Sequence, residues 1–135
     1  MSEVTQFPDL QEAEWRWPHF SRAEMRCKGS GECRMDPAFM DTLEAIRADY
    51  GKPLAIVSGY RSPEYNARVS HTGSTGPHTT GRAVDIAIRG EDAHRLLKTA
   101  LAHGIRGVGV AQKGQGRFLH LDMVTDGTRP WVWSY

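Results

Sequence analysis

The chain has 135 residues, 39% of them apolar and 24% charged, which is the size and composition of one globular domain. Its 17 Lys and Arg residues nearly balance its 16 Asp and Glu residues, and the arginines are scattered along the chain, which argues against a protein that binds nucleic acid or a membrane surface. No stretch approaches the roughly 18 apolar residues of a membrane span, and residues 1–8 lack the basic start and apolar run of a secretory signal, so we expect synthesis in the cytoplasm.

Two helices are predicted in the first part of the chain. Ser21 and Glu24 have the spacing of a capping box, which favours a short helical turn. A longer helix follows, with Asp36 as its cap, Pro37 in its first turn, apolar residues every three or four positions, and Gly51 at its end.

The two cysteines, Cys27 and Cys33, are separated by a flexible segment rich in Gly and Ser. They are suited to a disulfide that closes this loop or to two free thiols, and the sequence leaves both possibilities open. A structural zinc site would need two more ligands nearby, and none is evident.

The middle of the chain predicts a strand, a helix and a long polar loop. Residues 54–57 form a short apolar run of the kind found in buried strands. Ser62 and Pro63 form a cap and first-turn pair, which predicts a brief helix to about Val69. Residues 70–81 are dominated by Ser, Thr, Gly, Pro and His, and polar loops of this length are often functional.

The last part of the chain predicts three strands and one helix. Residues 83–88 are rich in strand formers and contain Asp85 as their one ionisable residue. Residues 91–103 have helical apolar spacing, whereas 107–110 and 117–124 are typical of strands. This order of elements predicts a single α+β domain with a mostly antiparallel sheet and flanking helices, and Trp131 and Trp133 lie in the tail beyond it.

Side chains alternate along a strand, so His120 and Asp122 share the face opposite to that of Leu119 and Leu121. The apolar face is expected to face the core. An ordinary solvent-exposed surface is the simplest interpretation of the polar face when it is considered alone.

Asp85 points to a different interpretation, because a carboxylate on an apolar strand needs a positive partner. Arg82 or a backbone amide would satisfy that need structurally. A zinc ion bound by His78, Asp85 and His120 would satisfy it too, and two imidazoles with one carboxylate leave a fourth position free, as in catalytic zinc sites.

These residues resemble the metal pattern of M15-type zinc peptidases, the family of D-Ala-D-Ala carboxypeptidases and phage endolysin peptidases, which has the hedgehog signalling domain as a distant fold relative. In that pattern a Ser-x-His segment precedes an Asp, and a His follows later on a strand. The matching segments are Gly76-Pro-His78, Gly81-Arg-Ala-Val-Asp85 and Phe118-Leu-His120-Leu-Asp122, and likeness to the short phage-associated branch extends to Trp15-Arg-Trp-Pro-His-Phe-Ser21 and Ser58-Gly-Tyr-Arg-Ser-Pro63-Glu-Tyr-Asn66.

The resemblance implies one zinc peptidase domain over residues 1–135, with zinc on His78, Asp85 and His120. It implies that Arg61 holds the substrate carbonyl or the oxyanion formed during cleavage. The implied substrate is the peptidoglycan stem peptide, cut by a carboxypeptidase or an endopeptidase of phage or prophage origin. Such an enzyme reaches the cell wall after lysis, by release or in a virion, and we expect it to be a monomer.

Two departures from the family pattern qualify this hypothesis. The related peptidases have a Glu, Asp or His base a few residues before the last zinc ligand, and here that place is taken by residues 115–118, which include no carboxylate. Asp122 is therefore the candidate either for the base or for a partner that orients an imidazole. Gly76 replaces the usual Ser, whose hydroxyl would be lost or supplied by Ser74 or Thr75. The alternative is a virion or binding module that keeps the zinc but is catalytically impaired.

Overall fold

The structure is a computed structural model that describes residues 6–135, so the first five residues, on which part of the signal-peptide expectation rests, lie outside it. Within the described residues, no helix has both the length and the apolar character needed to cross a bilayer. The helices and strands are α1 (Arg22–Met25), α2 (Pro37–Tyr50), β1 (Ala55–Ser58), α3 (Pro63–Val69), β2 (Ala83–Ala87), α4 (Gly90–Ala102), β3 (Gly107–Ala111), β4 (Phe118–Asp122) and β5 (Trp131–Ser134), with 3-10 turns at η1 (Glu12–Glu14), η2 (Gly73–Thr75) and η3 (Pro77–Thr80).

The helix boundaries follow the capping signals in the sequence. The Asp36 carboxylate accepts a hydrogen bond from the Ala38 amide at the start of α2. Gly51 ends that helix with φ of 83°, a left-handed conformation that glycine adopts without a Cβ penalty. Ser62 caps α3 by accepting from the Tyr65 amide. These local signals therefore place α2 and α3 where they were predicted.

The sheet has five strands in the order β1-β2-β4-β3-β5. All neighbouring pairs are antiparallel except β3 and β5, which are parallel. The expectation of a mostly antiparallel α+β domain is confirmed. β5 is a strand that the sequence reasoning missed, because it described the residues around Trp131 and Trp133 only as a tail.

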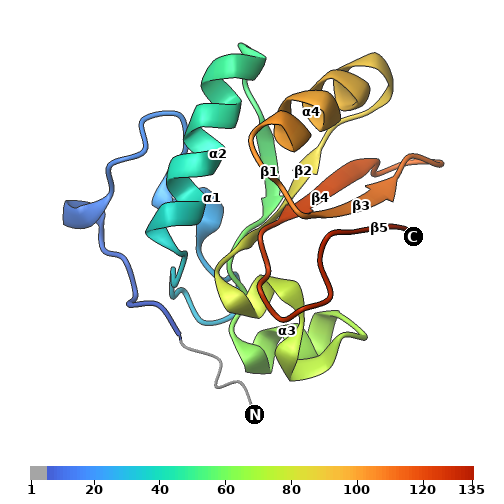
Figure 1. Cartoon of the computed structure of the whole chain (residues 1–135). Helices are drawn as coiled ribbons and strands as arrows, with labels where there is room; N and C mark the ends of the chain where they lie inside the picture. The colour runs from blue at the N-terminus through green and yellow to red at the C-terminus, as the bar shows by residue number, and fades with distance from the viewer. Residues whose placement is uncertain (1–5) are drawn as a thin grey trace.

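The two faces of the sheet have different coverings (Figure 1). Helices α2 and α4 pack together on one face, whereas α3 and the loop that follows it lie on the other. The alternation of β4 places Leu119 and Leu121 in the core under α2 and α4, as predicted. His120 and Asp122 project to the opposite face, where they are buried rather than exposed to solvent.

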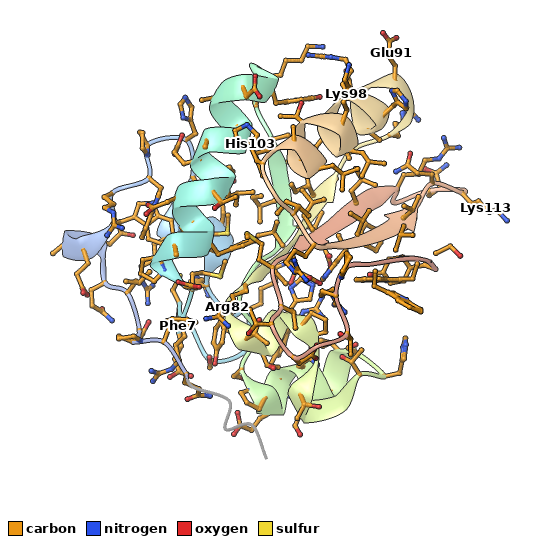
Figure 2. All side chains as sticks on the ribbon, in the orientation of Figure 1. Phe7, Arg82, Glu91, Lys98, His103 and Lys113 are labelled. Carbon is orange, nitrogen blue, oxygen red and sulfur yellow. The ribbon has the colours of Figure 1, made fainter. Side chains whose placement is uncertain are left out.

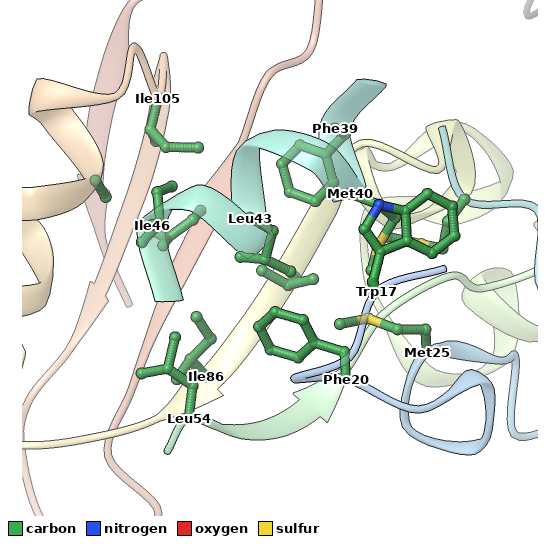
Figure 3. Close-up of a cluster of buried hydrophobic side chains, with 14 of the residues drawn as sticks. Trp17, Phe20, Met25, Phe39, Met40, Leu43, Ile46, Leu54, Ile86 and Ile105 are labelled. Atoms are coloured by element: carbon green, nitrogen blue, oxygen red, sulfur yellow. The ribbon is translucent and has the colours of Figure 1, made fainter. Parts of the chain in front are cut away.

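The hydrophobic core lies between α2 and the sheet, and Leu43 is fully buried at its centre (Figure 3). Because Leu43→Ala leaves a cavity in this close-packed region, we expect it to lower the free energy of unfolding by about 2–5 kcal/mol. Ala45→Ser on the exposed side of the same helix is the matched control, with an expected change within about 0.5 kcal/mol. Urea unfolding measures both, and equal losses would contradict this account of the core.

The structure contains both cysteines as buried free thiols. Burial alone would raise the pKa of Cys27, but hydrogen bonds from Ser30 and Ser62 outweigh it and lower that pKa to about 7. Burial raises the pKa of Cys33 to about 11. The Cys27 sulfur accepts from the Ser62 amide, so it ties the segment after α1 to the first turn of α3.

Candidate metal centre

Three side chains from two strands and a turn converge on the face of the sheet opposite α2 and α4. Asp85 on β2 is directly opposite His120 on β4 in the antiparallel register, and η3 brings His78 over them. One ligand atom from each of the three lies within 4.8 Å of the others. Their side chains are only 6%, 11% and 2% exposed for His78, Asp85 and His120. The structure thus brings together the three residues that the sequence nominated as metal ligands.

Each imidazole has one nitrogen engaged outside the cluster and the other directed at Asp85. His78 Nδ1 lies 2.8 Å from the Gly59 carbonyl oxygen, and its Nε2 lies 3.2 Å from Asp85 Oδ2. His120 Nε2 lies 2.7 Å from Asp122 Oδ2, and its Nδ1 lies 2.9 Å from Asp85 Oδ1. A carbonyl or carboxylate on the outer nitrogen is the usual arrangement of metal-binding histidines, because it fixes the tautomer.

The charge of Asp85 is met by these histidines rather than by Arg82. Burial alone would raise the pKa of Asp85, but hydrogen bonds from His120 and His78 hold it well below its usual range. Arg82 instead pairs with Asp36 at 2.8 Å, and its guanidinium lies over the ring of Phe7 (Figure 2). The structural alternative in which Arg82 neutralises Asp85 is therefore wrong.

Asp122 is fully buried and does not line the cleft beside the cluster. Arg129 binds both of its oxygens, with Nε at 2.9 Å and Nη2 at 2.8 Å. Burial alone would raise the pKa of Asp122, but the bonds from Arg129 and His120 lower it to about 2. A Cβ on Gly107 would lie 2.1 Å from Asp122 Oδ1, so the glycine makes room for this ion pair. The geometry suits a carboxylate that orients His120.

Asp122 and Asp85 together change the pKa of His120 and fix the orientation of its ring. Burial alone would lower the pKa of His120, but hydrogen bonds to Asp122 and Asp85 outweigh it and raise that pKa. Each ring nitrogen of His120 thus faces one carboxylate, and these two contacts fix the orientation of the ring.

Arg61 lies at the edge of the cluster, just after β1. Its Nε donates to Ser58 Oγ at 3.0 Å and its Nη1 to Asn66 Oδ1 at 3.1 Å. Its Nη2 lies 3.7 Å from Asp85 Oδ2, and the side chain is 19% exposed. Among the described residues, Asp85 is the carboxylate that lies within ion-pair distance of Arg61. The guanidinium is held by neutral partners and faces the candidate metal centre.

A cleft of about 740 Å³ opens beside the cluster. Its walls include Arg61, residues 69–72, Arg129 and the aromatic side chains of Phe118, Trp133 and Tyr135. Trp133 packs on Gly109, whose Cβ would lie 2.7 Å from the indole nitrogen. Strand β5 therefore supplies one wall of the cleft.

The donor set fits a catalytic transition metal. Two imidazoles, each oriented by a partner on its outer nitrogen, and one carboxylate are the three-ligand set of hydrolytic zinc sites, which keep a further position for water or substrate. The adjacent cleft gives a substrate access to that position.

Sequence reasoning missed Asn66, Thr72 and Arg129 as partners of the site. Asn66 stands inside the Ser58 to Asn66 segment that was already singled out, so its place in that motif was an available signal. No signal in the sequence pointed to Arg129, because its pairing with Asp122 depends on the path of the chain into β5.

Comparison with known proteins gives two findings. A sequence model described as peptidase M15 matches residues 18–122. The curated relatives include the peptidoglycan L,D-endopeptidase MepK of Escherichia coli strain K12, of Escherichia coli O157:H7 and of Shigella flexneri, each 33% identical over 103 residues. That match covers 72% of this chain and 54% of each relative, so the chain spans about half the length of the relatives it matches.

Proposed function

This chain belongs to the peptidase M15 family, and on that basis we propose that it is a zinc-dependent peptidase that cleaves peptide bonds in the stem peptides of bacterial peptidoglycan. The observation that carries the proposal is the convergence of His78, Asp85 and His120 beside Arg61, in a cleft open to substrate. The relatives' name, peptidoglycan L,D-endopeptidase, supports the substrate class. It also favours an endopeptidase over a carboxypeptidase, and we propose the endopeptidase first.

Zinc would be held by His78 Nε2, a carboxylate oxygen of Asp85 and His120 Nδ1, the atoms that face one another in the structure. Bound zinc supplies Lewis-acid chemistry, which polarises a carbonyl and lowers the pKa of water. The protein's part is to hold the ligand atoms in a fixed orientation through Gly59 and Asp122.

Arg61 is the proposed catalytic residue of the protein itself. Negative charge develops on the carbonyl oxygen when water attacks a peptide bond, and a fixed guanidinium stabilises it more in the transition state than in the bound substrate. Its Nε and Nη1 are already held by Ser58 and Asn66, so little reorganisation is needed at the moment of reaction.

Asp122 is proposed to position His120 rather than to accept a proton from water, because it is buried, bound to Arg129 and absent from the cleft walls. Asp122→Asn is therefore expected to weaken zinc binding and cleavage together, by about 10- to 100-fold each. Titration against a chromophoric chelator measures the zinc affinity. Unchanged zinc affinity with loss of cleavage and of the acidic limb of the rate profile would instead identify Asp122 as the base.

The proposed reaction is tested by digesting purified peptidoglycan and identifying the products by mass spectrometry. An endopeptidase separates cross-linked stem peptides, whereas a carboxypeptidase releases free D-Ala. Absence of both products, from protein that binds one zinc ion, would reject the proposed activity. Delivery to the wall after lysis, by release or in a virion is part of this proposal and is tested by locating the protein during infection or lysis.

A second candidate is a zinc-containing binding or virion module without catalysis. It is favoured by one observation: among the described residues, Asp85 is the one acidic side chain in the cleft walls, and Asp85 is a proposed ligand. This candidate predicts that the protein sediments with peptidoglycan in the presence of zinc and leaves its peptides intact.

A further inference from the structure

The carboxamide of Asn66 joins Arg61 to the loop that precedes His78. Asn66 is fully buried on α3. Its Oδ1 accepts from Arg61 Nη1 at 3.1 Å, and its Nδ2 donates to Thr72 Oγ1 at 2.9 Å and to the Gly73 carbonyl oxygen. Because both ends of the amide are engaged, the end that faces Arg61 is fixed.

Because Gly76 has no side chain, it leaves space for the contact between Thr72 and Asn66. Its φ of −66° is open to any residue, so backbone freedom does not explain the glycine. A Cβ at this position would lie 2.1 Å from Thr72 Oγ1 and 2.8 Å from Asn66 Nδ2. The Thr72 hydroxyl therefore lies where a side chain of residue 76 would begin, and it accepts from Asn66 Nδ2 in that place.

As a result, two hydrogen bonds fix the guanidinium of Arg61. Ser58 holds its Nε and Asn66 holds its Nη1, which leaves Nη2 directed toward Asp85. Loss of the Asn66 contact would free one end of the guanidinium plane. A shift of the order of 1 Å in such a group is enough to cost about 100-fold in rate.

We propose that Asn66 is a positioning residue that holds Arg61 at the metal centre, and that Thr72 holds Asn66 in the space left by Gly76. This inference rests on the catalytic role proposed for Arg61. It assigns a function to the polar loop at residues 70–76. The Thr72 hydroxyl in this loop orients the Asn66 amide, and the Asn66 amide orients the Arg61 guanidinium.

Asn66→Ala is expected to lower kcat by about 10- to 100-fold, with KM and zinc affinity within about twofold of the wild type, because the metal ligands keep their own partners. Asn66→Asp retains an acceptor for Arg61 and is expected to recover part of the loss. Thr75→Ala, at an exposed position of the loop that contains Thr72, is the control. A loss of zinc affinity parallel to that of kcat, or no loss of kcat, would overturn the proposal.

A double-mutant cycle on Thr72 and Gly76 tests the same link on the loop, where the fold is less at risk. Thr72→Gly removes the hydroxyl and Gly76→Ser displaces it, so each is expected to lower kcat about tenfold. In the double variant the serine takes the vacated space, and kcat should return to within about threefold of the wild type, a strongly non-additive result. If the double variant instead loses kcat by the product of the two single losses, the proposal is overturned. Thr75→Gly controls for loop flexibility.

A readout without substrate separates this inference from the proposed function. The Nε–H group of Arg61, bonded to Ser58, is expected to give a protected NMR resonance that is absent from Arg61→Lys and lost or broadened in Asn66→Ala. Failure of the wild type to cleave peptidoglycan would reject the proposed function and leave this test standing. An unchanged Arg61 resonance in Asn66→Ala would overturn the positioning role whatever the activity.

Discussion

Replacement of His120 by alanine is expected to abolish peptidoglycan cleavage and to weaken zinc binding by more than about 100-fold. Loss of a direct ligand should exceed the roughly 10- to 100-fold cost of losing an outer partner. The substitution also leaves Asp85 and Asp122 facing a cavity without the imidazole that bridges them. Zinc content after dialysis and release of amino groups from peptidoglycan measure the two effects.

The control for this variant is His94→Ala, an exposed histidine on α4, which should keep both zinc and activity. Because a buried carboxylate without its partner lowers stability, circular dichroism must establish that His120→Ala is folded. His120→Gln, which keeps a polar side chain, serves as a second variant. Stoichiometric tight zinc in folded His120→Ala would contradict the proposed ligand set.

Arg61→Lys is expected to lower kcat by about 100- to 1,000-fold while zinc affinity stays within about twofold. Lysine keeps the positive charge but cannot present a planar fork to Ser58, Asn66 and the substrate at once. The loss should therefore appear mainly in kcat, since the interaction strengthens as charge develops on the carbonyl oxygen. Steady-state kinetics on a soluble cross-linked muropeptide separate kcat from KM.

Arg68→Lys, on the exposed side of α3, is the matched control for charge and side-chain length. It should leave kcat unchanged. A rise in KM alone for Arg61→Lys would show that Arg61 binds substrate and transition state equally, which would contradict its role in stabilising the oxyanion.

Local signals in the sequence were enough to predict much of the scaffold of the site. The Asp36 and Ser62 caps define the starts of α2 and α3, and the alternation of β4 put His120 and Asp122 on one face. These features depend on neighbours within a few residues. The grouping of Asp85 with His120 came instead from the metal pattern, because their pairing across β2 and β4 joins residues that are distant in the chain.

Features that depend on distant parts of the chain were not predictable in this way. β5 pairs in parallel with β3 after a turn that contains Gly, Thr and Pro, in the segment that the sequence analysis described only as a tail. That strand brings in Arg129, whose ion pair with Asp122 argues against a catalytic base at Asp122. Burial of the polar face of β4 likewise depends on α3 and its loop folding across the sheet.

Zinc-dependent release of amino groups from purified peptidoglycan is the most direct test of the central claim. The protein is stripped with a chelator, dialysed, and assayed before and after the addition of one equivalent of zinc, with His120→Ala beside it. We predict no release from the stripped protein, restored release with zinc, and none from His120→Ala in either state. Release that persists in the stripped protein, or that His120→Ala retains, would contradict a zinc peptidase centred on His78, Asp85 and His120.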